Sequence, residues 1–152
     1  MRIVVASDHA GFPLKQEIAR RLTEAGHEVT DLGATSEERT DYPPFAAAAA
    51  RAVVAGEGEV GVLCCGSGIG VAISANKVPG ARAATARTEW DGEFARRHNH
   101  ANLLCLGGRV TAADYAWVIV EAFLAASEEG GRHAERVAQI TALEAGAVDA
   151  IG

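Results

Sequence analysis

The chain has 152 residues, of which 49% are hydrophobic and 22% charged, and its formal net charge at pH 7 is −6. This length and composition favour one globular domain, residues 1–152, and the charge argues against nucleic acid or an anionic membrane surface as the main partner. No window reaches the roughly 18 apolar residues of a membrane span, no signal peptide is visible, and the three cysteines predict neither a disulfide framework nor a zinc site, so we expect a reduced, cytoplasmic protein.

Short β-branched runs alternate with longer amphipathic segments, which is typical of βα units around a parallel sheet. Strands are predicted at 2–6, 27–32, 59–64, 81–86 and 102–106. Helices are predicted at 12–25, 45–55, about 70–76, 89–97, about 112–127 and 132–145. Gly26 is expected to end the first helix, Pro43 and Pro44 to begin the second, and Thr111 to cap the fifth. This order predicts a doubly wound α/β fold.

The most distinctive stretch follows the third predicted strand and reads Cys65-Gly66-Ser67-Gly68-Ile69-Gly70. Glycine has no Cβ, so it lets a backbone turn tightly and approach a ligand closely. The N–H groups of such a turn, followed by the start of a helix, form a cradle for an anion. Here the cradle also carries the thiol of Cys65 and the hydroxyl of Ser67.

Polar residues also follow two other predicted strands. Asp8 and His9 come after the first strand, and Arg109 comes after the fifth. In open parallel sheets, ligands bind outside the carboxyl ends of the strands. The sequence therefore predicts a small-molecule site at this edge of the sheet, shared with the glycine loop.

Several multi-residue motifs follow one another along the chain in the order found in a known enzyme family. They are Ser7-Asp8-His9-Ala10-Gly11 with Lys15, Glu38-Arg39-Thr40-Asp41-Tyr42-Pro43, Cys65-Gly66-Ser67-Gly68-Ile69-Gly70, Ala75-Asn76-Lys77-Val78-Pro79-Gly80, Arg97-His98-Asn99, Ala101-Asn102, and Gly130-Gly131-Arg132-His133 with Arg136. From end to end the chain thereby resembles the type B ribose-5-phosphate isomerases, which are grouped with galactose-6-phosphate and allose-6-phosphate isomerases.

The resemblance implies a three-layer αβα sandwich with a five-stranded parallel sheet, similar to a Rossmann fold. It also implies a homodimer, sometimes paired into a tetramer, in which two subunits build each active site and the helix at 132–145 lies at the interface. The implied reaction converts ribose 5-phosphate to ribulose 5-phosphate through an enediolate, with no metal or organic cofactor.

The resemblance assigns the catalytic roles to four residues. Cys65 matches the base that removes the C–H proton, and a thiol is made more acidic by backbone amides or helix starts. Some family members use a glutamate instead, but its position is occupied here by Val71. Ser67 matches a residue near the reacting carbonyl, although a loop hydroxyl also often satisfies a backbone group. His98 matches the residue that opens the sugar ring, with Asp8 as its partner.

Substrate binding is assigned in the same way. Arg132 and Arg136, one helical turn apart, match phosphate ligands, and arginine binds phosphate bidentately. His9 and Arg109 match further anion contacts. The remaining substrate-binding residues are Tyr42 in the pocket wall, Asn99 at the enediolate or a sugar hydroxyl, and the loop residues Gly66, Gly68 and Gly70.

Some residues depart from the family pattern, so the identity of the substrate sugar is not determined by the resemblance. Arg87, Trp90 and His100 stand near the motifs that shape the pocket, so a tetrose or tetrulose 4-phosphate or an allose or galactose 6-phosphate is an alternative substrate. His98 and His100 are spaced as a metal pair, but no third ligand is spaced to join them.

A nucleotide-binding module is the alternative from another class. The glycines of the loop resemble a dinucleotide loop, but that fingerprint requires glycine where Val71 stands.

Overall fold

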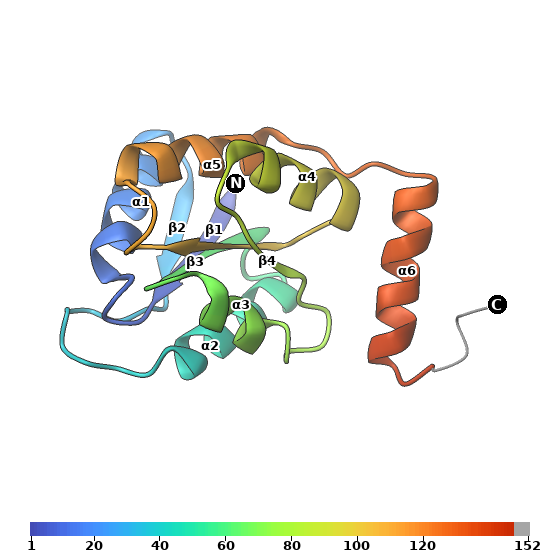
Figure 1. Ribbon diagram of the computed structural model, residues 1–152, viewed down its shortest axis with the longest axis horizontal. Helices are drawn as coiled ribbons and strands as arrows, with labels where there is room; N and C mark the ends of the chain where they lie inside the picture. Colours follow the sequence, from blue (N-terminus) through green and yellow to red (C-terminus); the bar gives the residue numbers. More distant parts are fainter. Residues whose placement is uncertain (148–152) are drawn as a thin grey trace.

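The computed structural model describes residues 1–147, so residues 148–152 of the predicted domain lie outside the described residues. Five parallel strands form one sheet in the order β2-β1-β3-β5-β4, with helices on both faces (Figure 1). The strands are β1 (Arg2–Ser7), β2 (Glu28–Asp31), β3 (Val60–Cys65), β4 (Ala83–Thr85) and β5 (Leu103–Gly107). The helices are α1 (Phe12–Glu24), α2 (Tyr42–Val54), α3 (Ile69–Ala75), α4 (Glu89–Asn99), α5 (Ala113–Ala125) and α6 (Arg132–Glu144). The predicted αβα sandwich is confirmed.

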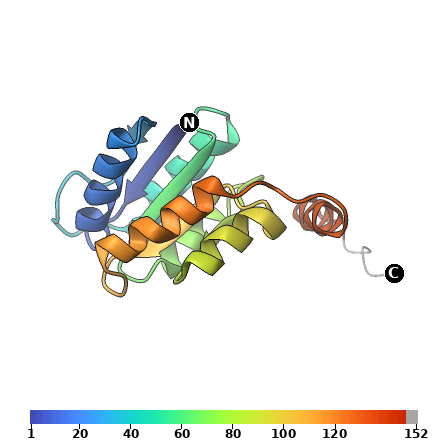
Figure 2. The same cartoon turned by 90° about the horizontal axis from the view of Figure 1, so that it is seen from above.

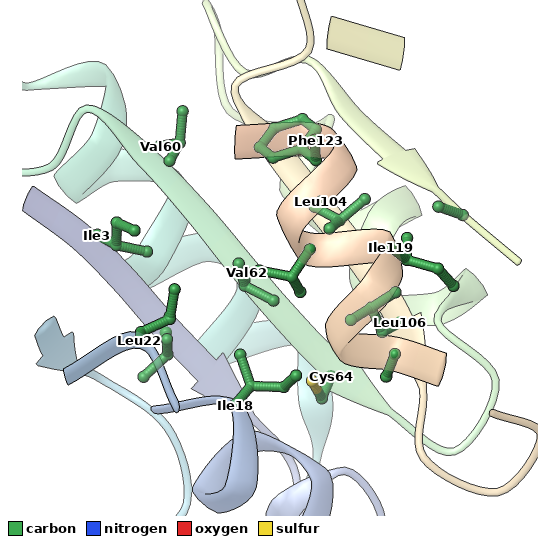
Figure 3. Packing of buried hydrophobic residues seen from close by; sticks show 14 of the residues in the cluster. Ile3, Ile18, Leu22, Val60, Val62, Cys64, Leu104, Leu106, Ile119 and Phe123 are labelled. Atoms are coloured by element: carbon green, nitrogen blue, oxygen red, sulfur yellow. The ribbon is translucent and has the colours of Figure 1, made fainter. Parts of the chain in front are cut away.

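Two apolar cores hold the layers together, one on each face of the sheet. Side chains of α1, α4 and α5 pack on one face, where Val62 of β3 meets Ile18 and Ile119 (Figure 3). Side chains of α2 and α3 pack on the other face. Because strand side chains alternate between faces, Cys64 enters the first core and Cys65 the second. The two neighbouring thiols therefore lie on opposite faces of the sheet.

Two of the three predicted helix boundaries are confirmed. Gly26 follows the C-cap of α1 with a φ of +85°, and Pro43 and Pro44 lie in the first turn of α2. The prediction that Thr111 caps α5 was wrong, because Ala112 occupies the N-cap position and no side chain caps this helix. The backbone N–H of Thr111 instead donates to the Gly107 carbonyl at 3.0 Å. Thr111 therefore belongs to the turn that follows β5.

The ammonium of Lys15 is buried, with 1% of its side chain exposed. It donates to both carboxylate oxygens of Asp31, at 2.9 and 2.7 Å, and to the Ala34 carbonyl at 2.6 Å. The residue thereby ties α1 to the end of β2 and to the loop that follows. A charge in this position is tolerated because it is paired and hydrogen-bonded.

We expect Asp31→Asn to lower the free energy of unfolding by about 3 kcal/mol, since it leaves a buried ammonium without its counter-charge. Urea denaturation of both proteins measures this change. Glu24→Gln is the matched control, because Glu24 pairs with Arg20 at the surface and such pairs contribute about 0.2–1 kcal/mol. A loss for Asp31→Asn no larger than the control's would contradict this account of Lys15.

Helix α6 stands beside the rest of the molecule in both views (Figures 1 and 2). It packs against α4 through its first turns, where His133 and Val137 are buried. Farther along the same side, Ile140 and Leu143 are 45% and 58% exposed. The apolar side of α6 is therefore largely uncovered within one chain. Among the described residues, no helix is long and apolar enough to cross a membrane.

Candidate active site

A cleft of about 730 Å³ opens at the carboxyl ends of β1, β3 and β5. The structure brings together here the predicted site residues Asp8, His9, Tyr42, Cys65, Gly66, Ser67, Gly70 and Arg109. They come from the ends of strands, the loops that follow them and the first turns of α2 and α3, which is where an open parallel sheet presents its ligand site. The volume lies within the roughly 300–1,000 Å³ that small-molecule sites span.

Cys65 ends β3 and borders the cleft, although the residue is only 4% exposed. The backbone N–H of Gly68 donates to Sγ at 3.2 Å, a contact that stabilises negative charge on sulfur. Gly68 holds this position with a φ of +78°, where a side chain would be strained. The other two thiols are 0% exposed, and burial raises the pKa of Cys64 and of Cys105 far above the usual range. Cys65 is the thiol that the fold presents to a ligand.

The glycines beside Cys65 let two side chains close over the loop. A Cβ on Gly70 would lie 2.8 Å from the ring of Tyr42, and one on Gly66 would lie 3.4 Å from the side chain of Arg109. Ser67 also borders the cleft, while its Oγ accepts the Ile69 N–H at 3.3 Å. Its hydroxyl therefore satisfies a backbone group in the manner expected of a loop serine, and still faces the cleft.

The first loop is fixed by hydrogen bonds to its neighbours. Asp8 is buried, and its Oδ1 accepts the Gly11 N–H at 2.9 Å. The backbone N–H of His9 donates to Thr40 Oγ1 at 3.1 Å, and its Nδ1 faces the Thr40 carbonyl at 3.1 Å. His9 thus joins the loop after β1 to the segment that enters α2 and presents Tyr42.

Part of the cleft wall was not predicted from the sequence. Arg39, Thr40 and Asp41 border the cleft, as do Ile69 and Ile73 on α3. Arg39 adds a second guanidinium to the wall that Arg109 also borders, and guanidinium groups are suited to binding anions. The signal was present, since Arg39 belongs to the same motif as Tyr42.

The remaining predicted residues lie elsewhere in the chain. His98 and Asn99 end α4, while Arg132 and Arg136 lie in the first turns of α6. Helix α4 leads into β5, so it ends near the amino end of that strand, whereas Cys65 lies near the carboxyl ends. A helix of this length spans roughly 16 Å. Within residues 1–147, one chain therefore does not bring His98 to its own cleft or to Asp8, its predicted partner.

A compact cluster surrounds His98. Its ring stacks on that of His133, with centroids 3.9 Å apart, and contacts the Phe94 ring edge-on at 4.7 Å. Oε2 of Glu129 lies 3.5 Å from Nε2 of His98, and Arg97 donates to Oε1 of the same carboxylate at 2.7 Å. That hydrogen bond lowers the pKa of Glu129, and burial lowers the pKa of His133.

His98, Glu129 and His133 bring three ligand atoms within 4.8 Å of one another, a grouping the sequence spacing did not reveal. The two rings are parallel to within 8°, so an ion about 2.0–2.1 Å from both nitrogens would lie well outside the plane of at least one ring. Nε of Arg132 also approaches Nε2 of His133 at 3.4 Å. The cluster as folded does not fit a metal centre. His100, the other candidate, faces the Glu129 carbonyl at 2.8 Å instead.

Comparisons with known proteins agree on one family. Residues 3–140 match the Ribose/Galactose Isomerase family. The chain is 47% identical over 143 residues to ribose-5-phosphate isomerase B of Escherichia coli strain K12, covering 94% of this chain and 96% of the relative. Ribose-5-phosphate isomerase B of Clostridium thermocellum superposes with a TM-score of 0.95 at 46% identity, covering 96% of this chain and 99% of that one. The enzyme of Mycoplasma genitalium, solved with bound ribulose-5-phosphate, gives 0.91 at 40% identity and covers 95% and 96%.

Proposed function

This chain belongs to the ribose/galactose isomerase family and is a sugar-phosphate aldose–ketose isomerase, and we propose that it interconverts ribose 5-phosphate and ribulose 5-phosphate. The observation that carries the substrate choice is the combination of a thiol, Cys65, with anion-binding groups in the wall of a cleft of sugar-phosphate size. The similarity to ribose-5-phosphate isomerases B over nearly the whole chain supports the same choice.

Cys65 is the proposed base. The reaction moves a proton between C2 and C1 through a cis-enediolate, so a base must remove a weakly acidic C–H proton while negative charge grows on oxygen. The sulfur of Cys65 already accepts the Gly68 N–H. The remaining N–H groups of the loop and the hydroxyl of Ser67 are placed to hold the oxyanion, and such donors contribute roughly 3–4 kcal/mol each. The anion cradle of the loop thus serves the enediolate.

The ring-opening and phosphate groups come from a second copy of the chain in this proposal. His98 and Asn99 are far from the cleft of their own chain, as are Arg132 and Arg136. A homodimer that seats α6 on the neighbouring subunit would cover its exposed apolar side and complete each cleft. The phosphate then meets Arg132 and Arg136 of one subunit and His9 and Arg109 of the other, while His98 opens the furanose ring with Asp8.

The chemistry of this site uses acid–base groups of the protein and calls for no metal or organic cofactor. A base that acts as a thiolate also has to stay reduced, and the three cysteines are free. Reducing conditions are those of the cytoplasm, which is the location we propose.

Direct assay tests the proposed substrate. We expect kcat/KM for ribose 5-phosphate to exceed that for allose 6-phosphate and for tetrulose phosphates. A higher kcat/KM for one of the other sugar phosphates would make that sugar the assigned substrate instead. Thermal stabilisation by NAD or ATP, with none by ribose 5-phosphate, would contradict a sugar-phosphate site altogether.

Arg136→Ala is expected to raise KM for ribose 5-phosphate about 10- to 100-fold with little change in kcat, since hydrogen bonds to charged groups contribute about 1.5–3 kcal/mol. The phosphate is bound alike in the ground state and the transition state, so its loss weakens both equally. Steady-state kinetics separates the two constants. Arg20→Ala, at a surface arginine of α1, is the control. A defect in kcat alone would argue against a phosphate contact.

A further inference from the structure

Glu129 is held against the end of α4 at three points. Its Oε1 accepts from Nε of Arg97 at 2.7 Å, and its backbone N–H donates to the Arg97 carbonyl at 2.9 Å. Its own carbonyl faces Nε2 of His100 at 2.8 Å. These contacts leave Oε2 facing two imidazoles, 3.5 Å from Nε2 of His98 and 3.7 Å from Nε2 of His133. The carboxylate therefore has a defined place beside His98.

Two aromatic contacts also hold the ring of His98, whose side chain is 31% exposed. His133 covers one face, and Phe94 contacts the ring edge-on from one helical turn earlier. Phe94 is itself covered by Trp90 at 4.4 Å and by the guanidinium of Arg97 at 4.9 Å. An imidazole packed in this way keeps one orientation, which acid–base catalysis requires of its proton donor.

The charges around His98 complement this packing. Glu129 stays ionised because the hydrogen bond from Arg97 lowers its pKa, and Arg97 is itself also paired with Glu93. Burial and the nearby charges of His98, Arg132 and Arg136 lower the pKa of His133 against the opposing effect of Glu129, which favours the neutral form of the stacked ring. The carboxylate of Glu129 is thus the negative charge in contact with His98.

We propose that Glu129 is a positioning residue for His98. Its carboxylate faces Nε2, which fixes the orientation of the ring and stabilises the imidazolium that carries a proton on each nitrogen, so that Nδ1–H can donate to the sugar. During ring opening the C1–O4 bond breaks, Nδ1–H gives its proton to O4, and Asp8 takes the proton from O1 as C1 becomes a carbonyl carbon. A carboxylate behind a catalytic histidine has the same effect in serine hydrolases. The inference rests on the proposed role of His98 in opening the ring.

Glu129→Gln keeps the shape of the side chain and removes its charge. We expect kcat/KM for ribose 5-phosphate to fall about 10- to 100-fold, less than the roughly 10⁴-fold effect of the buried carboxylate in serine proteases. A second rate separates positioning from a general loss of structure. Ribulose 5-phosphate carries its phosphate on O5 and cannot close a furanose ring. Enzyme-catalysed exchange of its C1 hydrogen with D₂O needs the base but no ring opening, so we expect Glu129→Gln to leave this exchange within about threefold of wild type.

Two further variants make each outcome decisive. Glu128→Gln is the matched control, because Glu128 pairs with Arg96 and His100 and should leave both rates unchanged. His98→Asn should show the same split as Glu129→Gln, with a larger loss of isomerisation.

Wild-type isomerisation in Glu129→Gln beside a defective His98→Asn would refute the positioning role and leave the proposed function standing. Equal loss of exchange and isomerisation in Glu129→Gln would reduce Glu129 to a structural contact. Full isomerisation in His98→Asn would refute the ring-opening role and this inference with it, and absence of both rates in the wild type would refute the proposed function itself.

Discussion

Cys65→Ala is expected to lower kcat for ribose 5-phosphate at least ~10²-fold, the scale of a lost acid–base group, while the substrate still binds. The thiol contributes to the chemical step, whereas the phosphate contacts that dominate binding lie on other side chains. Steady-state kinetics gives kcat, and stabilisation of the variant by ribose 5-phosphate in a thermal melt shows that binding persists. The C1 exchange of ribulose 5-phosphate should fall with kcat, since both rates need the same base.

Cys105→Ala provides the control for this result. Cys105 is buried in the core of β5, so its loss affects packing and should leave kcat near wild type. Iodoacetamide should likewise inactivate the native enzyme by labelling Cys65, since this residue borders the cleft whereas Cys64 and Cys105 are 0% exposed. Unchanged turnover in Cys65→Ala would remove this residue as the base.

The fold could be predicted from the sequence because each face of the sheet leaves a local signature. Alternating apolar residues in β1 send Val4 and Val5 to opposite cores, and amphipathic segments such as α1 repeat with helical spacing. Boundaries were less predictable where tertiary contacts decide them. The strand predicted at 81–86 is ordered as a strand only over Ala83–Thr85 at the edge of the sheet, and the cap of α5 is set by the turn after β5 rather than by Thr111.

The residues of the candidate site also divide into those that local sequence patterns predict and those that tertiary contacts determine. The cleft residues could be named because a parallel sheet gathers the loops after its strands at one edge, whatever the details of packing. The contacts of Glu129 and His133 with His98 could not be predicted from the sequence. They depend on how the segment before α6 crosses the end of α4, and no local sequence pattern indicates that crossing. The separation of His98 from Cys65 follows from the direction of α4, and it became visible only in three dimensions.

The separation of His98 from Cys65 within one chain leads to the second prediction with a large expected effect. It concerns the activity of a mixture of two inactive variants. Cys65→Ala and His98→Asn should each be nearly inactive alone, and activity should return when they are mixed and their subunits exchange. In a mixed dimer with shared sites, one site carries both defects and the other carries neither. Random exchange makes half the dimers mixed, each with one of two sites intact, so recovery should approach about a quarter of the wild-type activity.

The two possible arrangements of the site predict opposite results in this mixture. If His98 served the cleft of its own chain, each mixed dimer would hold one site without the thiol and one without the imidazole, and activity would stay at the level of the single variants. A mixture of Cys65→Ala with Cys65→Ser controls for exchange itself and should recover nothing under either arrangement. Recovery in the first mixture alone would therefore assign the thiol and the imidazole of each site to different subunits, as we propose from the position of His98 at the far end of α4.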